Sequence, residues 1–280
     1  MKRISGIVAA GFVALSTTLV AGHAIAQAPT AKKVEVQWLG QATIKITSPG
    51  GKVIVIDPWV TTNPKTPAAF KDLDALGKVD AILVTHAHFD HWADAPALAA
   101  KNGAKIYGPA GLGGSATALG IVPAGTMPGF NKSGTIMPAG PGIKVTAVHA
   151  EHSSELQWKN PATGKDEMHI GGEPIGFIIE LENGFRIYHM GDTGLFGDMK
   201  MIGEYYKPDL ILIPIGGNFT MDPKDAAFAT REYIKPKFAI PIHYGTFPAL
   251  KGTPAEYSEA LGKSATTKVF ALNPGDKHEF

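Results

Sequence analysis

Short runs rich in β-branched residues dominate the first part of the chain. The pattern predicts strands over residues 34–39, 43–47 and 52–56. Ser48-Pro49-Gly50-Gly51 separates the last two runs, and such a turn sequence predicts a hairpin. Residues 80–85 (DAILVT) form an apolar run bounded by polar residues, which is typical of a buried strand.

The second half of the chain repeats this strand pattern and adds helical segments. The apolar runs predict strands over residues 143–148, 174–181, 185–190, 209–213 and 238–242. Glu182-Asn183-Gly184 predicts a tight turn between two of them. Since strands outnumber helices, with meanders first and alternating elements later, the order predicts two sheets covered by helices.

Three segments carry helix signals. Residues 92–101 have Asp94 as a candidate N-cap and Pro96 in the first turn. Residues 223–234 begin after Asp222, and the last predicted helix covers residues 254–261. Frequent glycine and proline between residues 108 and 142 predict mostly loop with small elements there.

The N-terminus has the layout of a secretory signal peptide. Lys2 and Arg3 precede a small and apolar stretch over residues 4–22, and Ala24-Ile25-Ala26 matches an A-x-A cleavage site. A transmembrane anchor is the alternative, because the stretch approaches the ~20 residues that span a bilayer. We expect residues 1–26 to be removed and the protein to be periplasmic or secreted, with no stable membrane anchor. Residues 27–280 are predicted to form one domain.

Composition excludes several functional classes. The 280 residues include no cysteine, which excludes disulfides, thiolate metal sites, iron–sulfur clusters and a cysteine nucleophile. The 26 basic and 25 acidic side chains nearly balance. This balance argues against nucleic acid as a partner, because phosphate binding normally requires a basic excess. A small-molecule substrate is the expected partner.

The strongest chemical signal is Thr85-His86-Ala87-His88-Phe89-Asp90-His91, directly after a predicted buried strand. Imidazole and carboxylate groups are the ligands that Zn²⁺ and similar divalent ions prefer. Four such donors within six residues, in a loop at a strand end, can converge on one point. The spacing therefore predicts a metal site.

Three later residues occupy similar positions. His152, Asp192 and His243 each follow a predicted strand. Strand ends carry functional groups into a common crevice, whereas groups within strands are fixed in packing. Taken singly, each residue could be a capping Asp or a His bonded to a backbone carbonyl. Together with the first cluster, they are predicted to complete the metal site.

These segments resemble a known family. T-H-A-H-F-D-H-W-A-D resembles the signature of the metallo-β-lactamase superfamily, and H-S-S, G-D-T-G and I-P-I-H-Y-G-T-F follow in that superfamily's order, as does Ile56-Asp57-Pro58 before them. Gly171-Gly172-Glu173-Pro174 and the segment from Gly216 to Met221 look like one branch in particular. That branch contains predicted metal-dependent hydrolases related to the ascorbate-6-phosphate lactonase group. The resemblance covers residues 34–272.

The resemblance implies an α/β (α+β) fold, the four-layer αββα sandwich, with two divalent metal ions at one edge. One ion would be held by His86, His88 and His152. The other would be held by Asp90, His91 and His243, with Asp192 bridging the two. Zinc is the first expectation for both ions, with manganese or iron as alternatives.

Other residues would support the centre. The resemblance places Asp57 behind the first cluster, where it would orient the loop. His152 is preferred over His149 as the metal ligand, and His149 would then stand behind a ligand or face the substrate. His189 either lines the pocket or is a strand histidine with satisfied nitrogens.

Two glycine-rich stretches complete the candidates. The backbone amides of Gly216-Gly217-Asn218 and the side chain of Asn218 either bind an anionic or carbonyl oxygen or form a structural turn. Residues 111–114 lack the G-K-[ST] ending of a phosphate loop and are predicted to turn the chain.

The implied chemistry is hydrolysis. Two divalent ions ~3.5–4 Å apart ionise a bridging water, and the hydroxide attacks a carbonyl or phosphorus. Asp90 would both bind metal and orient the nucleophile, and would carry a proton to the leaving group. The expected activity is cleavage of a small ester, lactone or phosphoester by an exported enzyme. The alternatives are a hydrolase of β-lactams or other amides and a non-catalytic metal-binding protein of the same fold.

Overall fold

The computed structural model describes Met1 and residues 33–280. Residues 33–280 belong to one compact unit. Apart from Met1, the predicted signal peptide over residues 1–26 lies outside the described residues, so it stays a prediction. Within the described residues, no helix has the length and apolar character that spanning a bilayer requires.

The first sheet contains the predicted N-terminal meander. Its strand order is β15-β1-β2-β3-β4-β5. The strands are β1 (Glu35–Gly40), β2 (Thr43–Thr47), β3 (Val53–Ile56), β4 (Ala81–Leu83), β5 (Lys105–Tyr107) and β15 (Lys277–Glu279). β1, β2 and β3 are antiparallel neighbours, whereas β3, β4 and β5 are parallel. The predicted hairpin is confirmed by the pairing of Thr47 with Val53.

The second sheet contains all five strands predicted for the later part of the chain. Its order is β14-β13-β12-β11-β10-β7-β6. The strands are β6 (Thr135–Ile136), β7 (Lys144–His149), β10 (Ile175–Glu180), β11 (Arg186–His189), β12 (Leu210–Pro214), β13 (Phe238–Ile242) and β14 (Lys268–Val269). The strands from β11 to β14 are parallel, and β10 is antiparallel to both β7 and β11.

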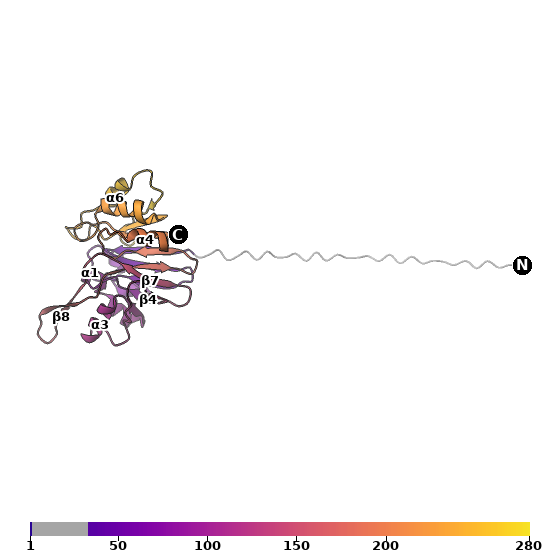
Figure 1. The fold of residues 1–280 in the computed structure, drawn as a ribbon. Coiled ribbons are helices and arrows are strands. Elements are labelled where there is room, and N and C mark those ends of the chain that lie inside the picture. The colour runs from indigo at the N-terminus through magenta and orange to yellow at the C-terminus, as the bar shows by residue number, and fades with distance from the viewer. Residues whose placement is uncertain (2–32) are drawn as a thin grey trace. The chain divides into compact units, whose positions relative to one another are not determined.

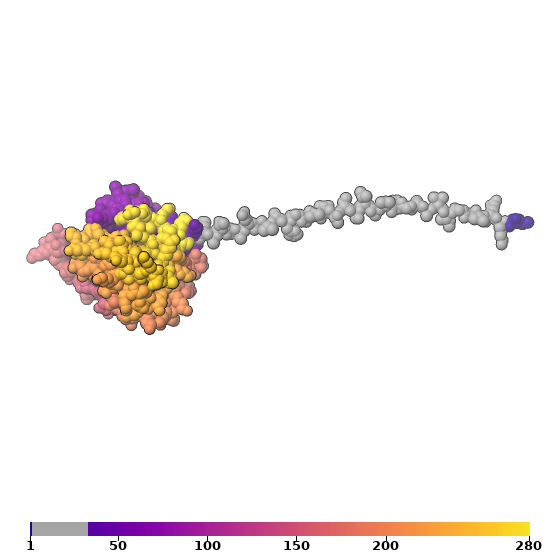
Figure 2. Space-filling view, turned by 90° about the horizontal axis from the view of Figure 1, so that it is seen from above, coloured from indigo at the N-terminus to yellow at the C-terminus, as the bar shows by residue number. Residues whose placement is uncertain are grey.

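Helices cover the outer face of each sheet. They are α1 (Phe89–Trp92), α2 (Ala95–Asn102), α3 (Ala110–Ala118), α4 (Met199–Tyr206), α5 (Pro223–Phe228) and α6 (Pro254–Leu261), with 3₁₀ turns at Ala68–Phe70 and Leu73–Leu76. Figure 1 shows α4 and α6 on one side of the paired sheets and α3 on the other. Seen from above, the side that carries α6 is covered by the C-terminal part of the chain (Figure 2).

Three apolar clusters correspond to the three contacts between the layers. Residues such as Ile46 and Phe177 fill the space between the sheets. Leu98 of α2 belongs to the cluster outside the first sheet, and Tyr257 of α6 to the cluster outside the second. The order of layers is therefore helix, sheet, sheet, helix. The expected αββα sandwich is confirmed.

The helix predictions need two corrections. The segment 92–101 divides between α1 and α2, and the side chain of Asp94 makes no capping bond. Its carboxylate instead accepts hydrogen bonds from the backbone N–H groups of Val60 and Thr61, at 2.6 and 2.9 Å. The segment 223–234 begins as α5 and ends as a π-helical turn over Ala229–Ile234.

Helix α3 corrects the prediction for the glycine-rich stretch. Residues 111–114 lie inside this helix and do not form a turn. A Cβ atom on Gly111 would lie 2.6 Å from the Cα atom of Gly172, and one on Gly113 would lie 2.8 Å from the carbonyl oxygen of Met127. These glycines allow α3 to pack closely against neighbouring backbone, a tertiary requirement that overrides their low helix propensity.

A hairpin that the sequence pattern did not predict projects from the body of the molecule. It consists of β8 (Glu155–Lys159) and β9 (Asp166–Ile170), and it pairs with neither sheet. Leu156 anchors it in the apolar cluster that contains α2 and α3. Figure 1 shows β8 extending to the left, and the same segment forms the left edge of Figure 2.

Replacement of Gly203 by Ala should destabilise the fold. Its Cβ would lie 2.6 Å from the Cα of Ile234, where α4 crosses the π-helical turn. We expect urea unfolding to show a loss of roughly 1–3 kcal/mol in the free energy of unfolding. Gly114→Ala is the matched control, because a Cβ there meets no atom within 4 Å in an exposed part of α3. The control should be neutral or stabilising, and equal losses in both variants would contradict the packing argument.

Candidate metal centre

The candidate side chains follow strands that run in the same direction. In the first sheet β1, β3 and β4 share a direction, and in the second β7, β11 and β13 do. The C-terminal ends of each set therefore lie at one rim of their sheet. The side chains that follow these ends are Gln41, Asp57, His86, His88, Asp90, His91, His152, Asp192 and His243.

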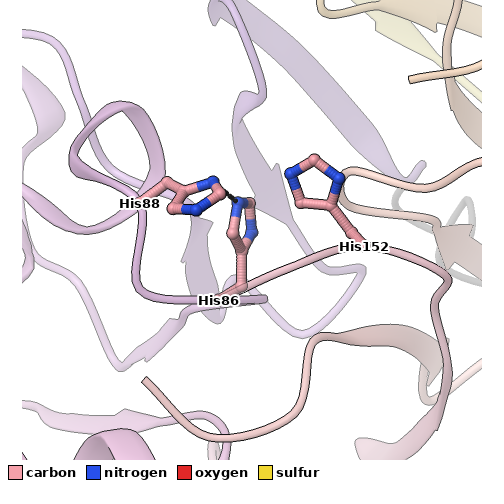
Figure 3. Close-up of side chains that lie close together, drawn as sticks. All are labelled: His86, His88 and His152. Atoms are coloured by element: carbon pink, nitrogen blue, oxygen red, sulfur yellow. Dashed lines mark hydrogen bonds between the residues drawn. The ribbon is translucent and has the colours of Figure 1, made fainter. Parts of the chain in front are cut away.

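One group of donors consists of His86, His88 and His152. Their nearest nitrogen atoms all lie within 4.8 Å of one another. Figure 3 shows the three rings gathered from two separate segments, the loop after β4 and the loop after β7. His86 Nε2 and His88 Nδ1 are 3.0 Å apart.

A second group consists of Asp90, His91 and His243, again with ligand atoms within 4.8 Å. Asp90 and His91 lie on the short helix α1, and His243 follows β13 with a φ of 55°. His243 Nε2 lies 3.5 Å from Asp90 Oδ2, and His91 Nε2 lies 3.7 Å from the same atom.

Asp192 lies between the two groups. Its Oδ2 atom is 3.0 Å from His243 Nε2 and 3.7 Å from His152 Nε2. Its Oδ1 atom is 3.3 Å from His91 Nε2. The preceding Gly191 has a φ of 63°, and a Cβ there would lie 2.8 Å from the Cβ of Thr85. This glycine lets the loop after β11 approach the first sheet, so that Asp192 reaches both groups.

The buried atoms of this cluster fit a divalent cation. Within residues 33–280, His91 Nε2 and Asp192 Oδ1 are buried and have no hydrogen-bond partner. A buried polar atom without a partner costs about 1–3 kcal/mol, and a bound cation would satisfy both atoms. Nitrogen and carboxylate oxygen donors also match the ligand chemistry of zinc and neighbouring transition metals.

The carboxylates and two of the histidines stabilise one another's charges. Burial opposes ionisation of Asp192, but His243 and His91 hold the pKa of its carboxyl well below the usual value. Burial is likewise outweighed at Asp90, where His91 and a hydrogen bond with His243 lower the pKa to about 2. Conversely, the Asp192 charge outweighs burial and raises the pKa of His243 to about 9.

In the first group, the pKa values of two histidines are lowered instead of raised. Burial, together with the positive charge of His91, lowers the pKa of His86 well below its usual value. Burial also lowers the pKa of His152. These two rings are therefore neutral at neutral pH, which is the form that binds a metal.

Asp57 determines which nitrogen atoms face the centre. It is fully buried, and its Oδ2 atom accepts hydrogen bonds from His91 Nδ1 at 2.8 Å and from the hydroxyl of Thr85 at 2.7 Å. Since the Thr85 hydroxyl donates to Asp57, it accepts from His86 Nδ1 at 3.0 Å. The Nε2 atoms of both histidines are consequently directed at the centre.

His149 lies outside the cluster. Its Nε2 is 3.3 Å from Glu151 Oε2, and its ring packs edge-on against Phe196. The structure thus brings His152 to the other donors, as preferred, and does not bear out the expectation that His149 stands behind a ligand or faces the substrate. The two histidines differ in position because His149 is the last residue of β7, whereas His152 lies in the loop that follows.

His189 and Asn218 do not line the cavity next to the cluster. His189 Nε2 donates to the carbonyl of Ala42 at 3.1 Å, and its Nδ1 accepts from the N–H of Gly191 at 3.2 Å. His189 is therefore a strand histidine in which both ring nitrogens are hydrogen-bonded to the backbone, and it does not line the pocket. Asn218 lines a separate depression, and the N–H of Gly217 donates to the carbonyl of Met221. The Gly217 amide therefore belongs to a structural turn, and oxygen binding by Asn218 stays a prediction.

Two further residues beside the centre were not identified from the sequence. Gln41 Nε2 donates to Asp90 Oδ2 at 2.7 Å and lies 2.8 Å from His243 Nε2. Glu155 Oε2 accepts from His88 Nε2 at 3.1 Å. Gln41 follows the end of β1, so the rule that identified the other strand-end residues would have found it.

Replacement of Asp57 by Asn should weaken metal binding without removing a ligand. The new amide N–H group would face His91 Nδ1 and the Thr85 hydroxyl, both of which donate to Asp57. Loss of such a supporting contact typically costs ~10–100-fold in metal affinity. Competition with a chromogenic zinc chelator measures this affinity.

Asp80→Asn is the matched control for this measurement. Asp80 also connects β3 to the segment around β4, because its carboxylate accepts from the N–H of Val53 at 2.9 Å. It lies just before β4, at the end away from the histidines. Its replacement should leave zinc affinity unchanged, and equal weakening in both variants would argue against the orienting role of Asp57.

Comparisons with known proteins agree with this geometry. Residues 52–244 match the sequence model of the Beta-lactamase superfamily domain. The chain is 61% identical to a UPF0173 metal-dependent hydrolase of Cupriavidus necator over 100% of both chains. It is 42% identical to a UPF0173 metal-dependent hydrolase of Rubrobacter xylanophilus, over 86% of this chain and 95% of that one.

A solved structure is also similar. Igni18, a metallo hydrolase from Ignicoccus hospitalis, superposes with a TM-score of 0.75 at 32% identity, over 89% of this chain and 98% of that one. The relation to the ascorbate-6-phosphate lactonase group stays a prediction. From the matched residues and these relatives, the chain belongs to the metallo-β-lactamase superfamily, within its UPF0173 family of metal-dependent hydrolases.

Proposed function

We propose that this protein hydrolyses a small ester, lactone or phosphoester at a centre of two divalent ions. The observation that carries the proposal is the convergence of seven donors, with Asp192 between the other six. These are His86, His88, Asp90, His91, His152, Asp192 and His243. The curated relatives are named metal-dependent hydrolases, which supports the same conclusion.

His86, His88 and His152 would hold one ion, and Asp90, His91 and His243 the other, with Asp192 contacting both. Bound divalent ions supply a Lewis acid and lower the pKa of water at this position. We expect zinc, with manganese or iron as alternatives, since histidine and carboxylate donors accept all three.

Asp90 is the residue we assign to proton handling. It lines the cavity, and its pKa of about 2 keeps it ionised at neutral pH. A carboxylate oxygen at this position would accept a hydrogen bond from the attacking water and so orient it, take the proton that the water gives up, and pass that proton to the leaving group. The amide of Gln41 fixes the carboxylate through its 2.7 Å hydrogen bond to Oδ2.

We further propose that the enzyme acts outside the cytoplasm, in the periplasm or in the medium. The support is the sequence of residues 1–26, with its basic start, apolar stretch and A-x-A site. A centre without thiolate ligands also suits an oxidising compartment, because the chain has no cysteine to be oxidised.

Metal analysis combined with a substrate panel tests the proposed activity. The panel contains p-nitrophenyl acetate, dihydrocoumarin, bis(p-nitrophenyl) phosphate and nitrocefin, which represent an ester, a lactone, a phosphodiester and a β-lactam. We expect about two metal equivalents and turnover of at least one of the first three substrates. A chelator should abolish that turnover, and added zinc should restore it.

The Asp90→Ala variant provides the residue-level test, with Asp198→Ala as the control. Asp198 is an exposed residue before α4 and makes no capping bond. We expect kcat to fall about 100- to 10,000-fold in Asp90→Ala and to be unchanged in the control. Bound metal without any turnover would support the non-catalytic alternative, and turnover of nitrocefin alone would support an amide hydrolase. Full activity of Asp90→Ala would remove Asp90 from the mechanism.

A further inference from the structure

Large apolar side chains and the metal-binding cluster line the same cavity, which has a volume of about 480 Å³. This volume is within the range of small-molecule sites. The lining includes the candidate donors His88, Asp90, His152, Asp192 and His243, and the polar residues Gln41, Ser153, Glu155 and Gln157. It also includes Phe89, Phe219, Phe247 and Met168. A molecule that reacts at the centre can place its remaining part against these last four side chains, which we call the apolar wall.

The aromatic half of the apolar wall is held rigidly. Phe247 stacks on the buried Trp59 with ring centres 5.8 Å apart, and Phe89 meets Trp59 edge-on at 5.4 Å. The indole N–H of Trp59 donates to the hydroxyl of Thr62 at 2.8 Å, which fixes the ring. The two phenylalanines consequently form a surface that exists before any ligand binds.

Three side chains of the apolar wall are largely exposed to solvent. Met168 on β9 is 64% exposed, Phe219 is 59% exposed and Phe89 is 52% exposed. Large apolar side chains that gather around one opening mark a binding surface more often than scattered ones do. Met168 reaches this opening because the β8–β9 hairpin pairs it with Gln157, which also lines the cavity.

The charges around the cavity select against an anionic group at the wall. None of the described residues that line it is a lysine or an arginine. Glu155 stands at the same opening, half exposed, with Oε2 3.1 Å from His88 Nε2. A carboxylate or phosphate placed away from the metal ligands would meet this negative charge without a fixed cation to pair with.

We infer that the non-reacting part of the substrate is an uncharged alkyl or aryl group that binds on the apolar wall. This inference rests on the proposed hydrolysis and narrows its substrate class. Phe89, Phe247 and Met168 are the residues that determine the specificity. A phosphate or carboxylate substituent on that part of the substrate is disfavoured.

Matched esters test the inference by kinetics on the metal-loaded protein. p-Nitrophenyl hexanoate should exceed p-nitrophenyl acetate in kcat/KM by about tenfold or more, since each buried methylene contributes up to about fourfold. The mono-p-nitrophenyl ester of adipic acid has the length of the hexanoate but ends in a carboxylate. It should lose most of the gain, and equal values for the three esters would overturn the inference while leaving the proposed hydrolysis intact.

Two substitutions that introduce a charge test whether the preference for the longer ester depends on the apolar wall. In Met168→Asp the preference for hexanoate over acetate should fall about fivefold or more. Met201→Asp is the control, because Met201 is 53% exposed on α4 and does not line the cavity. The control should keep the full preference, and a preference that survives in Met168→Asp would contradict the assignment of the wall.

A binding measurement separates this inference from the proposed activity. N-Phenyl-1-naphthylamine is an uncharged apolar dye whose fluorescence rises in apolar sites. We expect it to bind the metal-loaded wild type and the Met201→Asp control alike, and Met168→Asp at least fivefold more weakly. Absence of dye binding, or equal weakening by both variants, would overturn the apolar wall. Normal dye binding in a protein that hydrolyses no ester, lactone or phosphoester would instead overturn the proposed hydrolysis.

Discussion

The carboxylate of Asp57 is the interaction on which the centre depends. Through one oxygen atom it holds the ring of His91 and, by way of the Thr85 hydroxyl, the ring of His86. Its other oxygen accepts the backbone N–H of Thr85 at 2.7 Å, which fixes the start of the ligand-bearing loop. A fully buried carboxylate is tolerable because three donors satisfy it.

Hydrogen bonds from backbone N–H groups connect the loops that surround the centre. The N–H of His243 donates to the carbonyl of Gln41, and the N–H of Ile175 donates to the carbonyl of Thr85. The N–H of Glu151 donates to the hydroxyl of Thr193, which joins the loops after β7 and β11. Each ligand-bearing loop is thereby connected to a neighbour, so the donors are positioned by the fold itself.

The parts of this architecture that follow local rules could be predicted from the sequence. The buried strands follow from apolar periodicity, and the first histidine cluster from close spacing after a strand. The β8–β9 hairpin was not predicted because its strands are short and mostly exposed, with Leu156 as their one buried residue. Helix α3 was not predicted because Gly111 and Gly113 lower the helix propensity of this segment. They are required by close packing against neighbouring backbone, and a single sequence does not reveal that contact. The choice of His152 over His149 as the metal ligand depended on the resemblance to the family alone.

The β8–β9 hairpin has a consequence for how relatives of this protein can diverge. It brings Met168 to the opening of the cavity, yet it belongs to neither sheet and supplies none of the seven donors. Mutations that change the length of this hairpin, or the chemistry of side chains such as Met168, would change which molecules enter the cavity. The seven donors would stay the same. Substrate specificity can in this way evolve separately from the reaction, so that one fold serves enzymes with different substrates.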